Sequence, residues 1–179
     1  MSGVTGGAGS KSGVIGQTHG GIKEADMWRL TSGFTGNHDL NDNMERVDDA
    51  TFSKIGTGMD FTNTGDATWT FPSTGIWFIQ ASPKFFYNGN SAYNFATIEG
   101  YNGSSWDTLS QGSTAIPGAS NSIDDWCQLT AYVSAFLDVQ NTTSNKVKFS
   151  FTMGNQSVQV LGDSAYNRTY FTFIRLGDK

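Results

Sequence analysis

A chain of 179 residues fits one domain, and folding at this size buries roughly 70% of the unfolded surface, so a hydrophobic core needs no disulfide support. The formal net charge of -5 argues against a nucleic-acid-binding protein, which carries a basic surface. Charged residues make up only 15% of the chain, whereas 22 glycines and 13 phenylalanines favour strands and turns over long helices, so composition predicts an all-β protein.

The first 23 residues predict an extended arm. The opening sequence MSGVTGGAGSKSGVIGQTHGG has isolated Val4, Val14 and Ile15 as its only sizeable aliphatic groups. Such a segment buries too little apolar surface to offset the conformational entropy lost on ordering, and glycine raises that cost. We therefore expect residues 1–23 to be a docking arm that another protein holds through these three side chains, and residues 24–179 to form one folded domain.

Short segments separated by turn residues predict strands in the first half of this domain. Polar and apolar side chains alternate from Ala25 until Gly33. Residues 37–49 are polar and irregular, and the sequence Pro72-Ser73-Thr74 predicts a turn between two aromatic runs. The strands expected here are 25–32, a pair within 50–61 around Gly56 and Gly58, 68–71, and 75–81.

The second half carries clearer signals. Asn102-Gly103 predicts a turn between strands at 92–101 and 106–110, and residues 111–125 read as a long polar loop. The period-two alternation over residues 127–139 predicts one long, half-buried strand, with Cys127 among the core-facing positions. Further strands are expected at 147–153, after a turn at 141–145, and at 168–176. This series of short strands without a convincing helix predicts a β-sandwich or jelly roll.

Three stretches carry a resemblance to a known family: ATWTFPSTGIWFI at 67–79, FLDVQNTTSNKVKF at 136–149 and RTYFTFIRLG at 168–177. With them, the region from Phe52 to Gly177 resembles the tumour necrosis factor-like superfamily, which includes the globular heads of complement proteins. The segments GGAGSKSGVIG and ADMWRLTSGFTG resemble marine bacteriophage structural proteins that carry such a head. The loop after Val139, Asn-Thr-Thr-Ser-Asn, departs from the short Gly-Asp turn of many relatives.

The resemblance implies a TNF-like jelly-roll sandwich that forms a homotrimer, with aromatic side chains of two strands meeting on the three-fold axis. The matching positions are Tyr132 and Tyr170. The alternation points the same way, because it places Tyr132 and Phe136 on the face opposite the core, and exposed aromatics are typical of interfaces. The trimer interface expected here is thus Tyr132, Phe136 and Tyr170. The alternative is that the other layer of the sandwich covers these rings.

The sequence offers little catalytic or metal-binding chemistry. His19 lies in the arm and His38 in a polar loop, and neither has a nucleophile or metal partner at useful spacing. Cys127 falls on the same side of its expected strand as the core residues, which predicts a buried structural thiol. Residues 39–43 have the odd-position spacing of a calcium loop but lack its glycine and its glutamate. The acidic pairs at 48–49 and 124–125 could donate to calcium, although adjacent acids are commonly solvated. We expect no catalytic residues, no metal and no cofactor.

Two functions compete on these grounds. The first is a bacteriophage virion structural protein, a trimeric decoration or short-fibre subunit that the arm attaches to capsid or tail proteins. The second is a receptor-binding head that recognises a host surface glycan or protein through loop aromatics such as Tyr87, Tyr93 and Trp106, which could equally pack under their loops.

An enzyme such as a glycosidase is disfavoured, because it needs paired carboxylates in a cleft. Nucleic-acid binding and membrane insertion are not expected, and the expected location is the virion, after synthesis in the host cytoplasm.

Overall fold

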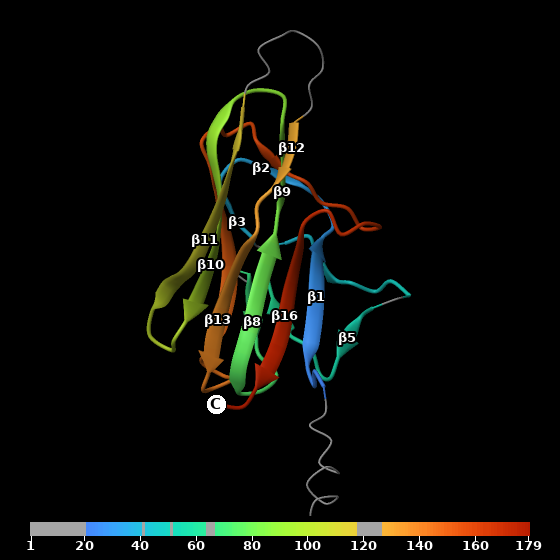
Figure 1. Ribbon diagram of the computed structural model, residues 1–179, viewed down its shortest axis with the longest axis vertical. Coiled ribbons are helices and arrows are strands. Elements are labelled where there is room, and N and C mark those ends of the chain that lie inside the picture. Colours follow the sequence, from blue (N-terminus) through green and yellow to red (C-terminus); the bar gives the residue numbers. More distant parts are fainter. Residues whose placement is uncertain (1–20, 41, 51, 64–66, 118–126) are drawn as a thin grey trace, which may run out of the picture.

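The computed structural model describes residues 21–40, 42–50, 52–63, 67–117 and 127–179, and in these ranges it contains strands and loops only. All strand pairs are antiparallel, and they form two large sheets and one small sheet. The sheets pack as an elongated sandwich whose strands run along its long axis (Figure 1). The all-β architecture expected from composition is confirmed.

The first large sheet contains the last strand of the chain near its middle. Its strands, in order, are β13 (Val133–Val139), β8 (Gly75–Ser82), β16 (Tyr170–Gly177), β1 (Ala25–Leu30) and β4 (Met44–Arg46), and β5 (Lys54–Ile55) also pairs with β1.

The second large sheet lies behind the first and contains the two longest strands. Its strands, in order, are β11 (Trp106–Ile116), β10 (Ser91–Tyr101), β14 (Lys146–Met153), β7 (Thr68–Thr70) and β6 (Asp60–Thr62), and β3 (His38–Asp39) also pairs with β14.

A small third sheet caps the end of the sandwich that lies away from the C-terminus (Figure 1). Its strands, in order, are β12 (Cys127–Thr130), β9 (Lys84–Tyr87), β15 (Gln159–Val160) and β2 (Phe34–Thr35). The described chain begins and ends at the other end of the sandwich, where Ile22 and Leu176 line one hollow.

Aromatic rings from both large sheets meet around Trp69 in the centre of the core. Trp69 is fully buried on β7, and its ring centroid lies 5.2 Å from that of Phe149 on β14. From the opposite sheet, Phe171 and Phe173 of β16 approach the same indole at 5.8 and 6.0 Å. Such ring pairs contribute about 0.5–1.5 kcal/mol each beyond their buried area, so this cluster ties the two sheets together.

The edges of the two large sheets also meet where β11 passes the start of β13. A Cβ atom at Gly112 would lie 2.6 Å from the carbonyl oxygen of Tyr132 and 3.0 Å from the Cβ of Val133. Real Cβ atoms essentially never approach backbone oxygens this closely, so only glycine permits the contact. The two edge strands are thereby brought together on one side of the sandwich.

Several expected elements are confirmed. The turn at Pro72–Thr74 separates β7 from β8, and the Asn102-Gly103 hairpin joins β10 to β11, with Gly103 at a φ of 101°. The alternation at 147–153 is confirmed by Val147, Phe149 and Phe151, which are at most 2% exposed. The expected docking residues Val4, Val14 and Ile15 lie outside the described residues.

Three expectations about strands are wrong. Residues 111–116, expected in a polar loop, belong to β11, because it is an edge strand whose outward side chains are polar. The single strand expected at 127–139 is two strands in different sheets, interrupted at Ala131 and Tyr132. The pair expected within 50–61 does not exist, because β5 pairs with β1 whereas β6 pairs with β7.

Buried Asp26 organises the loop that follows β4. Its carboxylate, 1% exposed, accepts hydrogen bonds from the indole Nε1 of Trp28 at 3.0 Å, the Nε of Arg46 at 3.0 Å and the backbone N of Met59 at 2.7 Å. The Arg46 guanidinium also stacks 4.8 Å above the Trp28 ring. One carboxylate therefore joins β1, β4 and the entry to β6.

Replacing Asp26 with alanine should destabilise the fold strongly, because it leaves a buried indole N–H, a backbone N–H and a guanidinium without their acceptor. We expect a loss of about 3–5 kcal/mol in the free energy of unfolding, measured by urea denaturation at fixed protein concentration. Asp60→Ala, at an exposed position on β6, is the control and should change it by less than about 0.5 kcal/mol. A similar small effect for both variants would contradict the role assigned to Asp26.

Candidate functional site

The outer face of the first sheet carries an apolar row where its strands pair. Phe136 on β13 is opposite Phe78 on β8, which is opposite Ile174 on β16. Their chain neighbours Ile79 and Phe173 are fully buried, so the alternation turns the row away from the core. Phe136 is 66% exposed, and its ring lies 5.6 Å from that of Phe78.

A second row with aromatic side chains lies four residues further along the strands, roughly 13 Å from the row of Phe136, Phe78 and Ile174. Tyr170 pairs with Ser82, and Val133, which follows Tyr132 in the chain, pairs with Ala81. Tyr132 is 66% exposed and Tyr170 is half-buried. Phe136 and Tyr170, expected together from the sequence, therefore lie on the outward face of this sheet, and Tyr132, just before β13, is exposed at its edge.

The row between them is polar, and two more exposed apolar side chains lie at the end of the sandwich where the described chain begins and ends. Gln80 and Thr172 pair with each other across β8 and β16. At the far end Leu176 and Ile22 are 58% and 52% exposed. Large apolar side chains that gather on one exposed face are typical of a protein–protein contact surface.

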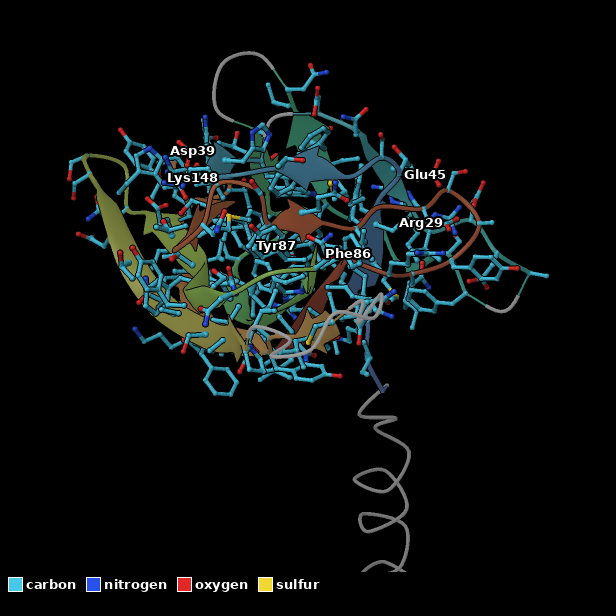
Figure 2. All side chains as sticks on the ribbon, turned by 90° about the horizontal axis from the view of Figure 1, so that it is seen from above. Arg29, Asp39, Glu45, Phe86, Tyr87 and Lys148 are labelled. Carbon is cyan, nitrogen blue, oxygen red and sulfur yellow. The ribbon has the colours of Figure 1, made fainter. Side chains whose placement is uncertain are left out.

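An ion-pair cluster borders this face beside Tyr170. Arg29, which pairs with Tyr170 across β1 and β16, is 5% exposed and donates to Glu45 at 2.5 Å and Asp48 at 2.7 Å (Figure 2). Burial disfavours the charge of Arg29, but its hydrogen bond to Glu45 and the attraction of Glu45 and Asp48 outweigh that cost and raise the pKa of Arg29 above its usual value. The border is therefore charged but paired, and it limits the apolar face on that side.

The three aromatics expected in receptor loops do not form one site. Tyr93 lies near the start of β10, whereas Trp106 pairs with Tyr101 at its end, eight residues or roughly 26 Å further along. Trp106 is half-buried, with the Lys148 ammonium 4.9 Å from its ring and the Tyr101 ring at 5.2 Å. Trp106 therefore packs within the outer surface of the second sheet.

Tyr87 has a structural environment as well. It packs against the hydrophobic core, and its hydroxyl accepts a hydrogen bond from the Nδ2 of Asn155 at 3.1 Å. Tyr93 is 43% exposed and stacks on Phe95 at 5.1 Å. Of the three expected residues, Tyr93 presents the most open ring.

Sequence reasoning missed the neighbour of Tyr87. Phe85 is fully buried, so Phe86 lies on the opposite, outward side of β9 (Figure 2). There it lines a hollow of about 180 Å³ together with Gln128, Gln159, Leu161 and Arg168. The aromatic run Lys84-Phe85-Phe86-Tyr87 was visible in the sequence. Only the strand pairing shows that Phe85 faces the core and Phe86 faces outward.

A second hollow, of about 380 Å³, lies between the β10–β11 turn and the loop after β13. Its amides are largely used within the loops themselves: the Oδ1 of Asn145 accepts from the backbone N of Gln140 and Asn141, and its Nδ2 donates to the carbonyl of Tyr101. Asn102 likewise closes its own turn by accepting from the backbone N of Ser104. These groups fix the loop conformations.

Reactive side chains remain dispersed. In the part of the chain that the structure describes, no three His, Cys, Asp or Glu side chains gather as metal ligands, and no helix could span a membrane. His38 stacks on Phe34 at 4.4 Å, and Asp48 binds Arg29. Cys127 is half-buried and packs against the core, which agrees in part with the buried thiol that was expected. His19 and the acidic pair at 124–125 lie outside the described residues.

Comparison with known proteins identifies the fold. No protein-family model and no curated protein matches this chain. Solved structures do match: murine APRIL at pH 8.5 has a TM-score of 0.58 at 12% identity, over 86% of this chain and 98% of APRIL. Eiger TNF from S. frugiperda has a TM-score of 0.59 at 10% identity, over 87% of this chain and 93% of Eiger. Likeness at this identity shows the fold alone, and the predicted TNF-like jelly roll is confirmed.

Removing the Tyr87 hydroxyl should cost stability, because it removes the shorter of the two hydrogen bonds of the Asn155 amide and leaves only the one to the Asn90 carbonyl at 3.4 Å. For Tyr87→Phe we expect a loss of about 1 kcal/mol in the free energy of unfolding. Tyr93→Phe, which removes a hydroxyl from an exposed ring, is the matched control and should stay within about 0.5 kcal/mol of the unmodified protein. Thermal unfolding followed by circular dichroism measures both, and equal midpoints would contradict a structural role for Tyr87.

Proposed function

We propose that this protein is a non-enzymatic structural subunit of a bacteriophage particle, a homotrimeric surface decoration or short-fibre protein that its N-terminal arm attaches to capsid or tail proteins. The observation that carries the assembly part of this proposal is the aromatic outer face of the first sheet. The particle part is supported by the resemblance of residues 6–16 and 25–36 to phage structural proteins.

The aromatic face favours self-association. Tyr132 and Phe136 each leave two thirds of their surface in water, and Phe78 and Ile174 extend the same apolar row. Burying such side chains contributes about 1.5–3 kcal/mol each relative to exposure. Most soluble homo-oligomers have closed symmetry, so copies that cover this face are expected to form a closed assembly. The resemblance to the TNF-like superfamily makes three the expected number.

The geometry of the termini suits attachment through the arm. The described chain begins at Gly21 beside Leu176 and Gly177, at one end of the sandwich (Figure 1). About twenty residues precede this point, and an extended segment of that length spans roughly 60–70 Å. In this proposal Val4, Val14 and Ile15 make the apolar contacts with the particle, and the jelly roll stands on the surface with its terminal end inward.

A second candidate function is recognition of a host surface glycan or protein. The observation that favours it is the location of β9 and the start of β10, which carry Phe86 and Tyr93, toward the end of the sandwich opposite the termini (Figure 1). A subunit anchored by its terminal end would direct this region outward. Tyr87 and Trp106, which have structural partners, would take no direct part.

The double variant Tyr132→Asp/Tyr170→Asp should not form trimers, because assembly would bury two unpaired carboxylates in each subunit, which is strongly unfavourable. Analytical ultracentrifugation should give a single-subunit mass or show loss of soluble protein. Tyr166→Asp is the matched control, since Tyr166 is 69% exposed outside this face, and it should leave the assembly intact. An intact trimer in the double variant would defeat the interface assignment.

The arm should be required for attachment but not for assembly. A variant that lacks residues 1–20 should remain trimeric and should bind mature particles at least about a hundredfold more weakly than the full chain, since the proposed contacts lie in the arm. Cosedimentation with particles measures binding, and a labelled antibody on intact particles shows whether heads or tails carry the protein. Full-length protein that stays in the supernatant, with no antibody label on particles, would eliminate the virion assignment.

A further inference from the structure

The outward face of the small third sheet carries an ordered row of side chains. Across three strands Gln128 pairs with Phe86, and Phe86 pairs with Gln159. The inward neighbours Phe85 and Val160 are fully buried, so the alternation directs the row away from the core. Because neighbouring strands lie roughly 4.8 Å apart, the two glutamines flank the phenylalanine across about 10 Å.

This row forms one wall of the hollow of about 180 Å³, which Leu161 and Arg168 complete. Drug-sized ligands occupy sites of roughly 300–1,000 Å³, so this hollow suits a single small ring. An aromatic ring offers an apolar surface, and each glutamine amide can both donate and accept hydrogen bonds. A sugar ring needs this combination, because it has an apolar C–H face and a rim of hydroxyl groups.

Arg168, the cation that lines the hollow, is paired and held in place. Arg168 has 43% of its side chain exposed, and its Nε lies 3.1 Å from the Oδ2 of Asp163. The backbone N–H of Ala165, which donates to this carboxylate, lowers the pKa of Asp163 below its usual value, and Arg168 contributes to the same shift. Asp163 therefore stays ionised and orients the guanidinium, whose terminal nitrogens can bind a carboxylate in two-pronged geometry. Lys84 adds a second cation on the same side of β9 as Phe86.

We propose that this hollow binds a carboxylate-bearing monosaccharide unit, such as a uronic acid, of a surface glycan. The sugar ring packs against Phe86, Gln128 and Gln159 bind its hydroxyl groups, and Arg168 binds its carboxylate. This site deepens the second candidate function and depends on it for its biological role. It also assigns that role to residues outside the set expected from the sequence, since Phe86 and Arg168 replace Tyr87 and Trp106.

The test uses the full-length protein and two soluble probes, methyl glucuronide and its neutral counterpart methyl glucoside. Nuclear magnetic resonance follows the side-chain amide signals of Gln128 and Gln159 during titration. Methyl glucuronide should shift both signals with half-saturation on the order of 1 mM, as expected for a ligand of this size. Methyl glucoside should bind about tenfold more weakly, because it lacks the charged partner of Arg168.

Variants at exposed positions separate the contacts without disturbing the core. Arg168→Gln should weaken methyl glucuronide about tenfold and leave methyl glucoside unchanged, whereas Gln159→Ala should weaken both. Lys146→Gln, on β14 near the opposite end, is the control and should change neither. Circular dichroism verifies that each variant is folded.

Two results would overturn the proposal: amide signals that do not move up to the solubility limit of methyl glucuronide, or equal affinity of Arg168→Gln and the unmodified protein for that probe. No virus particle takes part in this experiment. A negative result therefore removes the saccharide site alone, whereas the attachment and antibody experiments decide the virion assignment independently.

Discussion

The contact between the two large sheets at Trp69 is the constraint on which the rest of the molecule depends. The indole packs against Phe149 of its own sheet and against Phe171 and Phe173 of the other. In both sheets, alternate residues of the strands must therefore face the core. Because successive side chains of a strand point to opposite faces, the residues between them face outward. The exposed aromatic face of the first sheet and the Gln–Phe–Gln row of the third sheet are both products of this partition.

The outward-facing side chains differ in chemistry from sheet to sheet, and this difference separates the proposed roles. The first sheet presents the apolar row of Phe136, Phe78 and Ile174. On the second sheet Lys148 lies 3.8 Å from Glu99 and 4.9 Å from the Trp106 ring, and Ser150 donates to the same glutamate. An apolar face gains free energy from being covered, whereas a paired polar face gains little. The proposed self-association therefore uses the first sheet, and the proposed ligand site uses the capping sheet.

Sequence patterns predicted which residues face the core, but they could not predict which strand each segment pairs with. The alternation through Ala131 and Tyr132 continues unbroken while the chain leaves one sheet and enters another, because side-chain periodicity carries no information about the hydrogen-bonding partner. For the same reason the outward positions of Phe136 and Tyr170 could be predicted, since they depend on alternation alone. The hollow at Phe86 was not found, because it needs the register of Gln128 and Gln159 from distant parts of the chain.

The close approach at Gly112 has a consequence for crowded surfaces. Exposed sheet edges recruit strands from other molecules and so lead to fibrous aggregates. Here the backbones of β11 and β13 meet where glycine lacks a side chain, so each of these borders shields part of the other. Less backbone at these two edges is therefore open to pairing with strands of other molecules.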